Sequence, residues 1–292
     1  NKVSVTNRYK MLKIDLFNLE ETVKGINLSN PDIIFHLAAE SHVDRSISKP
    51  GEFIKSNVIG TFNLLEASLK HFRSLSTERK NKFKFIHIST DEVFGSLNEN
   101  GRFSEISCYD PRSPYSASKA SSDHFVKAWF HTFNLPIIVS TCSNNYGPWQ
   151  FPEKFIPKVI CNALQNKEIP IYGEGKNVRD WLFVDDHIDA LILLSRVGEV
   201  GESYCIGGNS EKSNNELVSD ICGILDKKYP NKFPHNKLIK YVKDRPGHDK
   251  RYSINFDKIK TKHGWEPSYD FKKGLLKTVE WYIKNISWAK DI

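Results

Sequence analysis

Short runs of consecutive apolar residues alternate with longer amphipathic segments along most of the chain. The short runs are apolar on adjacent positions, which is typical of strands that are covered on both faces, as in a parallel sheet. They predict strands at residues 10–15, 32–38, 83–90, 137–143 and 202–208. The amphipathic segments predict helices at residues 18–28, 52–72, 113–133, 155–166, 185–196, 214–228 and 271–285. This alternation of strand and helix predicts an α/β fold with a doubly wound parallel sheet.

The second half of the chain is less regular than the first. It contains the Pro- and Gly-rich stretches YGPWQFPEKFIP, IPIYGEGKNVRDW and DRPGHDKRY. The change in regularity predicts a nucleotide-type sheet domain and a smaller mixed α/β lobe assembled from later segments. We expect the sheet domain to comprise residues 1–150 plus about 181–208, and the smaller lobe residues 151–180 plus 209–292.

Composition limits the classes of protein to which the chain can belong. Of its 292 residues, 39% are hydrophobic and 26% are charged, a balance that allows a globular core. No apolar run approaches the roughly 20 residues that span a bilayer. The five cysteines form no CxxC pair, which indicates a reducing cytoplasm rather than a disulfide framework. No cluster of His, Cys and carboxylates has metal-ligand spacing, so we expect no metal.

The net charge of +7 has two interpretations. It can be an ordinary solvated basic surface, or it can attract an anionic substrate. Nucleic acid is a weaker alternative, because Lys and Arg are spread along the chain without a basic block or a binding motif.

The segment YSASK places Tyr115 and Lys119 four residues apart, on one face of a predicted helix. An ammonium group beside a phenol favours the phenolate and lowers its pKa, so that the phenol can take a proton from a substrate hydroxyl. Taken alone, this spacing is typical of an ordinary surface pair. Its position behind a strand that ends in STDE favours a catalytic role.

Thr90, Asp91 and Glu92 end the apolar run FKFIHIST. Two adjacent carboxyls at a strand end repel each other, so one keeps its proton while its neighbour is ionised. The alternative is a turn that carries two solvated acids. The pair Tyr115 and Lys119, which follows at suitable distance, favours a site that holds one acid and one base.

Several segments together resemble a known family. LAAESHVDRS, ISTDEVFG, SPYSASK, SNNYGP, GKNVRDWLFVDDH and RPGHDKRY are similar to the motifs of extended short-chain dehydrogenases, and the TDE triplet resembles that of nucleotide-sugar 4,6-dehydratases. The resemblance implies a Rossmann-like fold, NAD as cofactor and a nucleotide sugar, dTDP-glucose, as substrate. It also implies that Tyr115 and Thr90 serve oxidation at C4, that Glu92 removes the C5 proton, and that Asp91 protonates the leaving C6 hydroxyl.

The resemblance also implies binding residues. The cofactor contacts would be Asp15, Leu16, Leu37, Ala38, Ala39, Glu40, Ser41, Ser56, Tyr115, Lys119 and Asn145. The substrate contacts would be Ser41, Thr90, Asn144, Lys154, Phe155, Pro170, Tyr172, Arg179, Asn214, Arg245 and His248. Among these, Pro170 and Tyr172 would form the wall on which the base stacks. Arg179 and Arg245 would clamp the diphosphate, because guanidinium binds phosphate oxygens in bidentate fashion and stays charged.

Three alternatives remain open. The same chemistry can act on UDP-glucose or CDP-glucose, because the two acids never touch the base. A nucleotide-sugar 4-epimerase would lose no water, and Asp91 and Glu92 argue against it. A non-catalytic protein without cofactor is the third, because the family's glycine-rich turn, GxxGxxG, does not occur in this sequence. We expect the strand, turn and helix that contain it to precede residue 1, which leaves the Rossmann-like sheet N-terminally truncated.

The resemblance finally implies a homodimer that pairs through two long helices, here residues 52–72 and 113–133. Their apolar residues Phe53, Phe62, Leu65, Phe125 and Trp129 could equally pack on the chain's own sheet. The sequence does not assign each of them to the core or to an interface.

Overall fold

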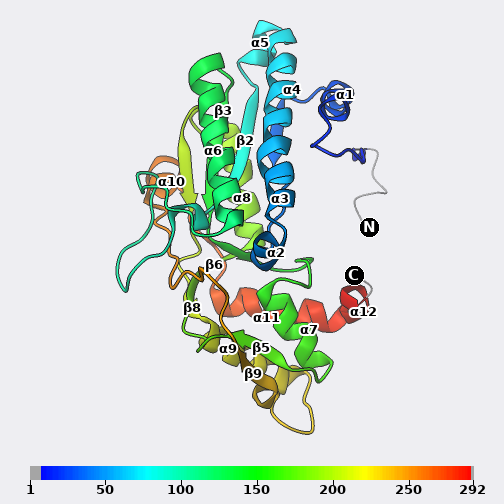
Figure 1. Ribbon diagram of the computed structural model, residues 1–292, viewed down its shortest axis with the longest axis vertical. Coiled ribbons are helices and arrows are strands. Elements are labelled where there is room, and N and C mark those ends of the chain that lie inside the picture. The colour runs from blue at the N-terminus through cyan, green and yellow to red at the C-terminus, as the bar shows by residue number, and fades with distance from the viewer. Residues whose placement is uncertain (1–7, 291–292) are drawn as a thin grey trace.

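The computed structural model of the chain describes residues 8–290. A four-stranded parallel sheet organises its larger lobe (Figure 1), and its strand order is β1-β2-β3-β7. The strands are β1 (Ile33–His36), β2 (Lys84–Thr90), β3 (Ile137–Cys142) and β7 (Ser203–Ile206). Each lies inside a run that the sequence predicted as a strand, and the doubly wound parallel α/β fold is confirmed.

Helices cover the two faces of this sheet, as Figure 1 shows for α4 and α6 in front and α8 behind. The principal helices of this lobe are α1 (Leu19–Ser29), α3 (Pro50–Phe53), α4 (Gly60–Ser74), α6 (Pro114–Phe133) and α8 (Val184–Val197). Successive side chains of β2 point to opposite faces of the sheet. Phe85 packs with α4 and α6 on one face, and Ile86 packs with α8 on the other. All six residues of β3 are buried, as its continuous apolar run predicts.

Two expectations for the start of the chain are wrong. Residues 10–15 form no strand, because they run beside α1 and α4 and pair with no neighbouring strand: Ile14 packs against Gly25, and Leu16 packs against Gly60. In addition, β1 is not covered on both faces. It is an edge strand of the described sheet, and its Ile33 and Phe35 are 37% and 39% exposed.

The predicted helix 52–72 is interrupted by a π-helical turn, Ile54–Ile59. Such turns replace the usual hydrogen bond to the fourth residue by one to the fifth and are frequent at functional sites. This one carries Ser56, which is half-buried, and Asn57, which is 1% exposed and faces inward. The turn therefore directs a polar side chain into the interior beneath the loop that follows β1.

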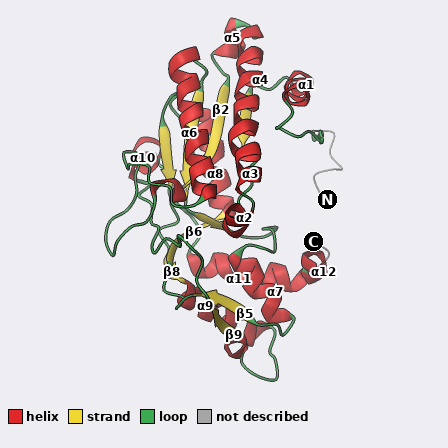
Figure 2. Ribbon diagram, in the orientation of Figure 1, coloured by secondary structure: helices red, strands yellow, loops and turns green. Residues whose placement is uncertain are grey.

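The smaller lobe is mixed α/β (Figure 2). It contains the parallel pair β5 (Ile169–Tyr172) and β9 (Ile239–Val242), packed with α7 (Phe155–Leu164), α9 (Asn214–Lys228) and α11 (Phe271–Lys284). A three-stranded sheet joins the two lobes and is formed by β4 (Asn144–Tyr146), β6 (Val178–Phe183) and β8 (Glu211–Ser213). The division of the chain into two domains at the boundaries given above stays a prediction.

The remaining elements are short. They are the helices α2 (Val43–Ser48), α5 (Thr77–Lys80), α10 (Asp257–His263) and α12 (Ile286–Lys290), and the 3-10 turns Asp91–Phe94 and His235–Leu238. No helix within residues 8–290 is both long and apolar enough to cross a bilayer.

Candidate active site

A cavity of about 200 Å³ lies where the carboxyl ends of the sheet strands meet the smaller lobe. Open parallel sheets bind their ligands at this edge. Many of the residues that the sequence singled out line it: Ser41, Glu92, Asn144, Asn145, Lys154, Phe155, Pro170, Tyr172, Arg179, Asn214, Arg245 and His248. Segments that are far apart in the sequence therefore converge on one site.

The end of β2 delivers the hydroxyl and the two acids. Thr90 ends the strand, and its hydroxyl accepts a hydrogen bond from the Glu92 amide at 3.4 Å, which caps the 3-10 turn that follows. Gly95 closes the turn at φ 82°, and a side chain there would lie 2.6 Å from the carbonyl oxygen of Asp110. The tight turn buries Asp91, which is 1% exposed, and leaves Glu92 facing the cavity.

The two acids have different environments. Burial raises the pKa of Asp91 well above its usual value, and the charges of Glu92 and Asp180 raise it further. Oδ2 of Asp91 has no hydrogen-bond partner among the described residues. Burial also raises the pKa of Glu92, but Arg179 and Arg245 oppose the rise. Burial thus favours the protonated form of Asp91, while two arginines favour the ionised form of Glu92, as expected of an acid–base pair.

Tyr115 and Lys119 lie on α6, whose first turn is fixed by a capping box between Ser113 and Ser116. Both are buried, and Lys119 Nζ donates to the carbonyl oxygen of Ile88 at 2.7 Å. The expectation of a lowered pKa for Tyr115 is wrong for the protein described here. Burial raises that pKa well above its usual value, the charge of Glu92 adds to the rise, and a hydrogen bond with Thr90 opposes it.

Arg245 lines the cavity and carries one buried donor without a partner among the described residues. Its Nε is buried and has no hydrogen-bond partner among the described residues, while its other nitrogens approach His248 at 3.2 Å and Asp44 at 3.5 Å. The guanidinium also lies 5.4 Å from the centre of the Tyr172 ring. An unpaired buried donor on a charged group is costly, so the geometry favours an anion as its partner.

Arg179 is held more rigidly. Its guanidinium donates to the carbonyl oxygens of Val178, Asp249 and Lys250 and stacks over Tyr252 at 4.2 Å. These bonds fix the direction of the positive charge beside Glu92. The assignment of Arg179 and Arg245 as diphosphate clamps stays a prediction.

Lys154 links the two lobes across the cavity. Its Nζ donates to the carbonyl oxygen of Ser41 at 2.5 Å and to the hydroxyl of Ser41 at 2.9 Å. Tyr172 makes a second link, because its hydroxyl donates to Asp44 at 3.0 Å. The walls of the cavity are therefore tied together by side chains of both lobes.

The predicted cofactor residues do not lie in one region. Leu37 and Ala38 are exposed beyond the end of β1, and Ala39 and Ser41 are half-buried behind them. The backbone of Glu40 exchanges hydrogen bonds with the Asn57 side chain at 2.8 and 2.9 Å. The loop is thereby pinned to the π-helical turn.

The other predicted cofactor residues described here are Asp15, Leu16 and Asn145, and they do not lie together. Asp15 and Leu16 do not line the cavity; Asp15 is exposed, and the carbonyl oxygen of Leu16 accepts from Asn63 at 2.9 Å. Asn145 does line it, and its Oδ1 is 2.9 Å from Nδ1 of His187.

Sequence reasoning missed several polar residues around the site. Asn57 bonds the β1 loop and, at 2.8 Å, the Ser118 hydroxyl on α6, but no motif marks it. His187 and Tyr252 come from segments whose neighbours were recognised. Asp123 had a readable signal, because it follows Lys119 at the same four-residue spacing that separates Lys119 from Tyr115. Among residues 8–290, no group of three or more His, Cys, Asp or Glu is placed to hold a metal ion.

Glu92 lines the cavity together with Arg179 and Arg245, whereas Thr90, Asp91, Tyr115 and Lys119 do not line it and are largely buried at the same carboxyl edge of the sheet. This combination defines the class of dehydrogenase-like enzymes that act on anionic, hydroxyl-bearing substrates.

Comparisons with known proteins place the chain within that class. The family model described as GDP-mannose 4,6 dehydratase matches residues 1–278. A dTDP-glucose 4,6-dehydratase of Xanthomonas campestris pv. campestris is 52% identical over 264 residues, which is 90% of this chain and 75% of the relative. The chain therefore belongs to the family of nucleotide-sugar 4,6-dehydratases.

Solved structures agree with this assignment. The dTDP-glucose 4,6-dehydratase of Bacillus anthracis str. Ames, in complex with NAD, is 43% identical with a TM-score of 0.86, over 99% of this chain and 85% of that one. The dTDP-glucose 4,6-dehydratase of Streptomyces venezuelae, with NAD bound, is 38% identical with a TM-score of 0.89, over 99% and 84%. The family resemblance read from the sequence motifs is confirmed.

Proposed function

We propose that this protein is a lyase that converts dTDP-glucose to dTDP-4-keto-6-deoxyglucose with NAD as a resident cofactor. The observation that carries this proposal is the turn Thr90–Asp91–Glu92 beside Tyr115, because it supplies a hydroxyl, an acid and a base in addition to the phenol. Oxidation alone needs only the phenol and a hydrogen-bond partner. The two acids are the groups that an elimination of water requires.

The residues present fit NAD. The loop Leu37–Ser41 lies open at the carboxyl edge of the sheet, where dinucleotides bind in this fold class. Within the described residues, Lys119 Nζ makes one hydrogen bond, to Ile88, so it retains donors for a cofactor hydroxyl. Ser56, Tyr115 and Asn145 would complete the binding set. When bound, NAD would supply the hydride acceptor for oxidation at C4 and the hydride donor for reduction at C6.

In the first step Tyr115 takes the proton of the C4 hydroxyl, while the hydrogen-bonding Thr90 holds the reacting oxygen in place. The C4–H bond breaks and a C4 ketone forms. Burial and the charge of Glu92 raise the pKa of Tyr115 in the described state. This step therefore depends on positive charge near the phenol, because such charge favours the phenolate.

In the second step Glu92 takes the proton of C5, which the new ketone has made acidic. Asp91 donates its proton to the C6 hydroxyl, the C6–O bond breaks, water leaves, and a C5–C6 double bond forms. Burial and the charge of Glu92 raise the pKa of Asp91, which favours the protonated form that this donor needs. Hydride addition at C6 and proton return to C5 from Glu92 then complete the conversion.

Recognition falls to the other wall of the cavity. The unpaired Nε of Arg245 and the rigid guanidinium of Arg179 suit a diphosphate. Pro170 and Tyr172, on β5, offer a flat surface for a pyrimidine base. These contacts determine the choice among dTDP-, UDP- and CDP-glucose, since the acids act at the sugar.

We also propose a homodimer that pairs through α4 and α6. Phe53 and Leu65 are fully buried in the chain's own core, whereas Phe62 and Phe125 are 37% and 38% exposed beside Trp129. A contiguous aromatic surface of this kind is typical of a protein interface. The five cysteines are free, which favours a reducing compartment such as the cytoplasm.

The proposed reaction is tested by incubating the protein with dTDP-glucose and NAD in deuterated water and following the sugar nucleotide by mass spectrometry. We expect loss of one water and uptake of solvent deuterium at C5. The Tyr115→Phe variant is the matched control, because it removes the phenolic oxygen and leaves both acids in place. Epimerisation or C4 oxidation without water loss would overturn the dehydratase assignment. Reaction only with UDP- or CDP-glucose would overturn the choice of nucleotide.

A further inference from the structure

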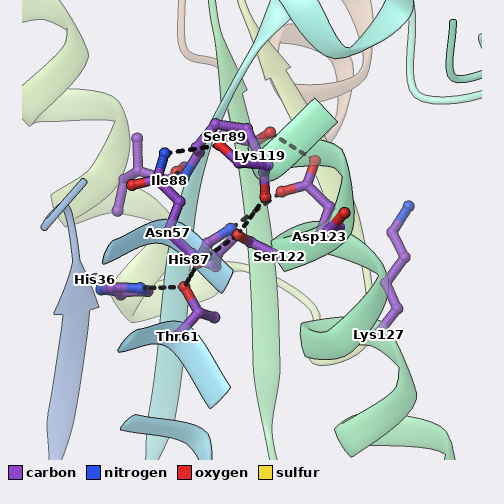
Figure 3. Close-up of polar contacts among 12 residues, drawn as sticks. His36, Asn57, Thr61, His87, Ile88, Ser89, Lys119, Ser122, Asp123 and Lys127 are labelled. Atoms are coloured by element: carbon purple, nitrogen blue, oxygen red, sulfur yellow. Dashed lines mark hydrogen bonds and ion pairs between the residues drawn. The ribbon is translucent and has the colours of Figure 1, made fainter. Parts of the chain in front are cut away.

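Buried polar side chains of β2 and α6 contact one another below the end of the sheet strand that carries Thr90; Figure 3 shows His87, Ser89, Lys119 and Asp123 among them. Tyr115, Lys119 and Asp123 follow one another at four-residue spacing and share one face of α6. That face packs on β2, whose His87 and Ser89 point to the same side of the sheet because they are two residues apart. The phenol, the lysine and a carboxylate are therefore stacked along one helix, and the carboxylate lies deepest.

Asp123 is 0% exposed and is fully committed to hydrogen bonds. It accepts from Nε2 of His87 at 3.0 Å, from the hydroxyl of Ser89 at 2.6 Å and from the hydroxyl of Tyr109 at 3.0 Å. Burial alone would raise the pKa of Asp123, but the hydrogen bond from His87, the charge of Lys119 and the hydrogen bond from Ser89 hold it below its usual value. Asp123 is thus a buried anion.

The histidines of this region do not supply a positive charge. Burial lowers the pKa of His87 and of His36, and the charge of Lys119 lowers both further. His36 instead bonds the Thr61 hydroxyl at 2.8 Å, and Nδ1 of His87 has no partner among the described residues. With the histidines neutral, Lys119 is the cation whose charge lowers the pKa of Asp123, while Lys127, four residues further along α6, donates to the hydroxyl of Tyr109 at 3.3 Å.

Other titratable groups surround Lys119 from each packed element. They are Tyr115 on α6, His36 on β1, His87 on β2, Asp91 and Glu92 in the turn after β2, Cys142 on β3, and Tyr109 in the loop before α6. Burial raises the pKa of Cys142 to about 12, so this thiol stays neutral. Burial lowers the pKa of Lys119, and the charge of Asp123 is the principal influence that opposes this fall.

Resting on the function proposed above, we infer that Asp123 is a positioning residue for proton transfer at Tyr115: oriented by His87, Ser89 and Tyr109, it is the buried counter-anion that keeps Lys119 an ammonium. Lys119 Nζ itself points to the carbonyl oxygen of Ile88, so Asp123 acts through its charge rather than through a direct hydrogen bond. Without that charge the lysine becomes neutral at lower pH, and Tyr115 loses the ammonium that shares its face of α6.

The direct test is NMR of the protein carrying isotope-labelled lysine, with the Lys119 signal assigned by its absence in Lys119→Met. Asp123→Asn removes the charge and keeps a side chain of the same size. An opposite charge within about 4–6 Å shifts a pKa by about 1–3 units, so we expect the Lys119 titration midpoint to fall by about one unit or more. An unchanged midpoint would overturn the inference. This readout needs neither cofactor nor turnover, so it is informative even if dehydratase activity is absent.

The kinetic test is the pH profile of kcat/KM. We expect the alkaline limb of Asp123→Asn to move to lower pH, with a loss of about tenfold per unit on that limb and agreement with the parent at low pH, where Lys119 is an ammonium in both proteins. A purely structural role predicts a loss that is equal at all pH values, and this result would overturn the inference. His87→Gln keeps a donor to Asp123, so its profile should match the parent; a shift as large as that of Asp123→Asn would assign the effect to the histidine instead.

Asp226→Asn is the matched control. Asp226 also accepts from a buried histidine, His235 at 2.5 Å, but it lies on α9 in the smaller lobe, outside the cavity lining. If Asp123→Asn does not fold, the double variant Lys119→Met/Asp123→Asn decides, because it removes both charges together. A higher Tm for the double variant than for Lys119→Met supports the pairing of these charges, and additive losses overturn it.

Discussion

Replacing Asp91 by asparagine removes a proton donor while it preserves the size of the side chain. Because burial raises the pKa of Asp91 and so favours its neutral form, asparagine is the closest uncharged substitute for it. The side chain makes one long hydrogen bond, from the Thr90 hydroxyl at 3.3 Å, and its Oδ2 has no partner among the described residues. The exchange therefore costs little in stability, about 1 kcal/mol or less.

The kinetic loss should be much larger. A positioned general acid contributes about 10²–10⁴-fold, which corresponds to about 3–5 kcal/mol of transition-state stabilisation. Tyr115 and Glu92 remain in place, so C4 oxidation and proton exchange at C5 should continue. We expect the Asp91→Asn variant to take up deuterium at C5 while releasing water about 10²–10⁴-fold more slowly.

Two measurements decide this prediction: mass spectrometry in deuterated water, and thermal unfolding between acidic and neutral pH. Since the folded-state pKa of Asp91 lies above its usual 3.8, its protonated form stabilises the fold at low pH, and this contribution is lost as pH rises through the raised value. The asparagine variant does not titrate, so its Tm relative to the parent should increase as pH rises. Water release within tenfold of the parent, or a Tm difference independent of pH, would refute the reasoning.

Three further predictions concern binding and stability. Arg245→Met should raise KM for the nucleotide sugar by about 10–100-fold with a smaller change in kcat, because a charged hydrogen bond contributes about 1.5–3 kcal/mol. A KM within twofold of the parent in steady-state assays would exclude the phosphate contact. Asn57→Ala leaves the backbone of Glu40 and the hydroxyl of Ser118 short of partners and should lower the free energy of unfolding by about 2–5 kcal/mol, measured by urea titration. Gly208→Ala places a methyl group 1.9 Å from the carbonyl oxygen of Trp181 and should prevent folding or lower Tm strongly. Gly223→Ala is the control, because a methyl group there has nothing within 4 Å and should raise stability slightly inside α9. Equal effects of the two variants on thermal melting, followed by circular dichroism, would contradict the packing argument.

Local sequence determines most of the sheet and helix positions. The fully apolar run of β3 and the capped start of α6 are readable because burial on both faces and a capping box leave direct marks in the sequence. Residues 10–15 have the same strand-like composition, but a strand also needs a partner, and partners are not local. The π-helical turn Ile54–Ile59 left no mark either, because its apolar spacing differs from that of an α-helix by a single residue.

The site divides in the same way. Thr90, Asp91 and Glu92, like Tyr115 and Lys119, are contiguous or regularly spaced, so their types and intervals predict their meeting. The contacts of Asn57 connect three elements and follow from tertiary structure alone. The direction of the Tyr115 pKa was misjudged for a similar reason: a neighbouring lysine is visible in the sequence, whereas burial and the approach of Glu92 are not.

The proposed catalytic residues and the proposed nucleotide-binding residues come from different parts of the chain. Thr90, Glu92 and Tyr115 lie on the sheet lobe, whereas Tyr172 and Arg245 belong to segments of the smaller lobe. With the roles proposed above, altering the second set would change which nucleotide is accepted and leave the reacting groups unchanged. Grafting a β5 segment from a UDP-specific relative into this chain is therefore a route to a new substrate preference that leaves the elimination machinery intact.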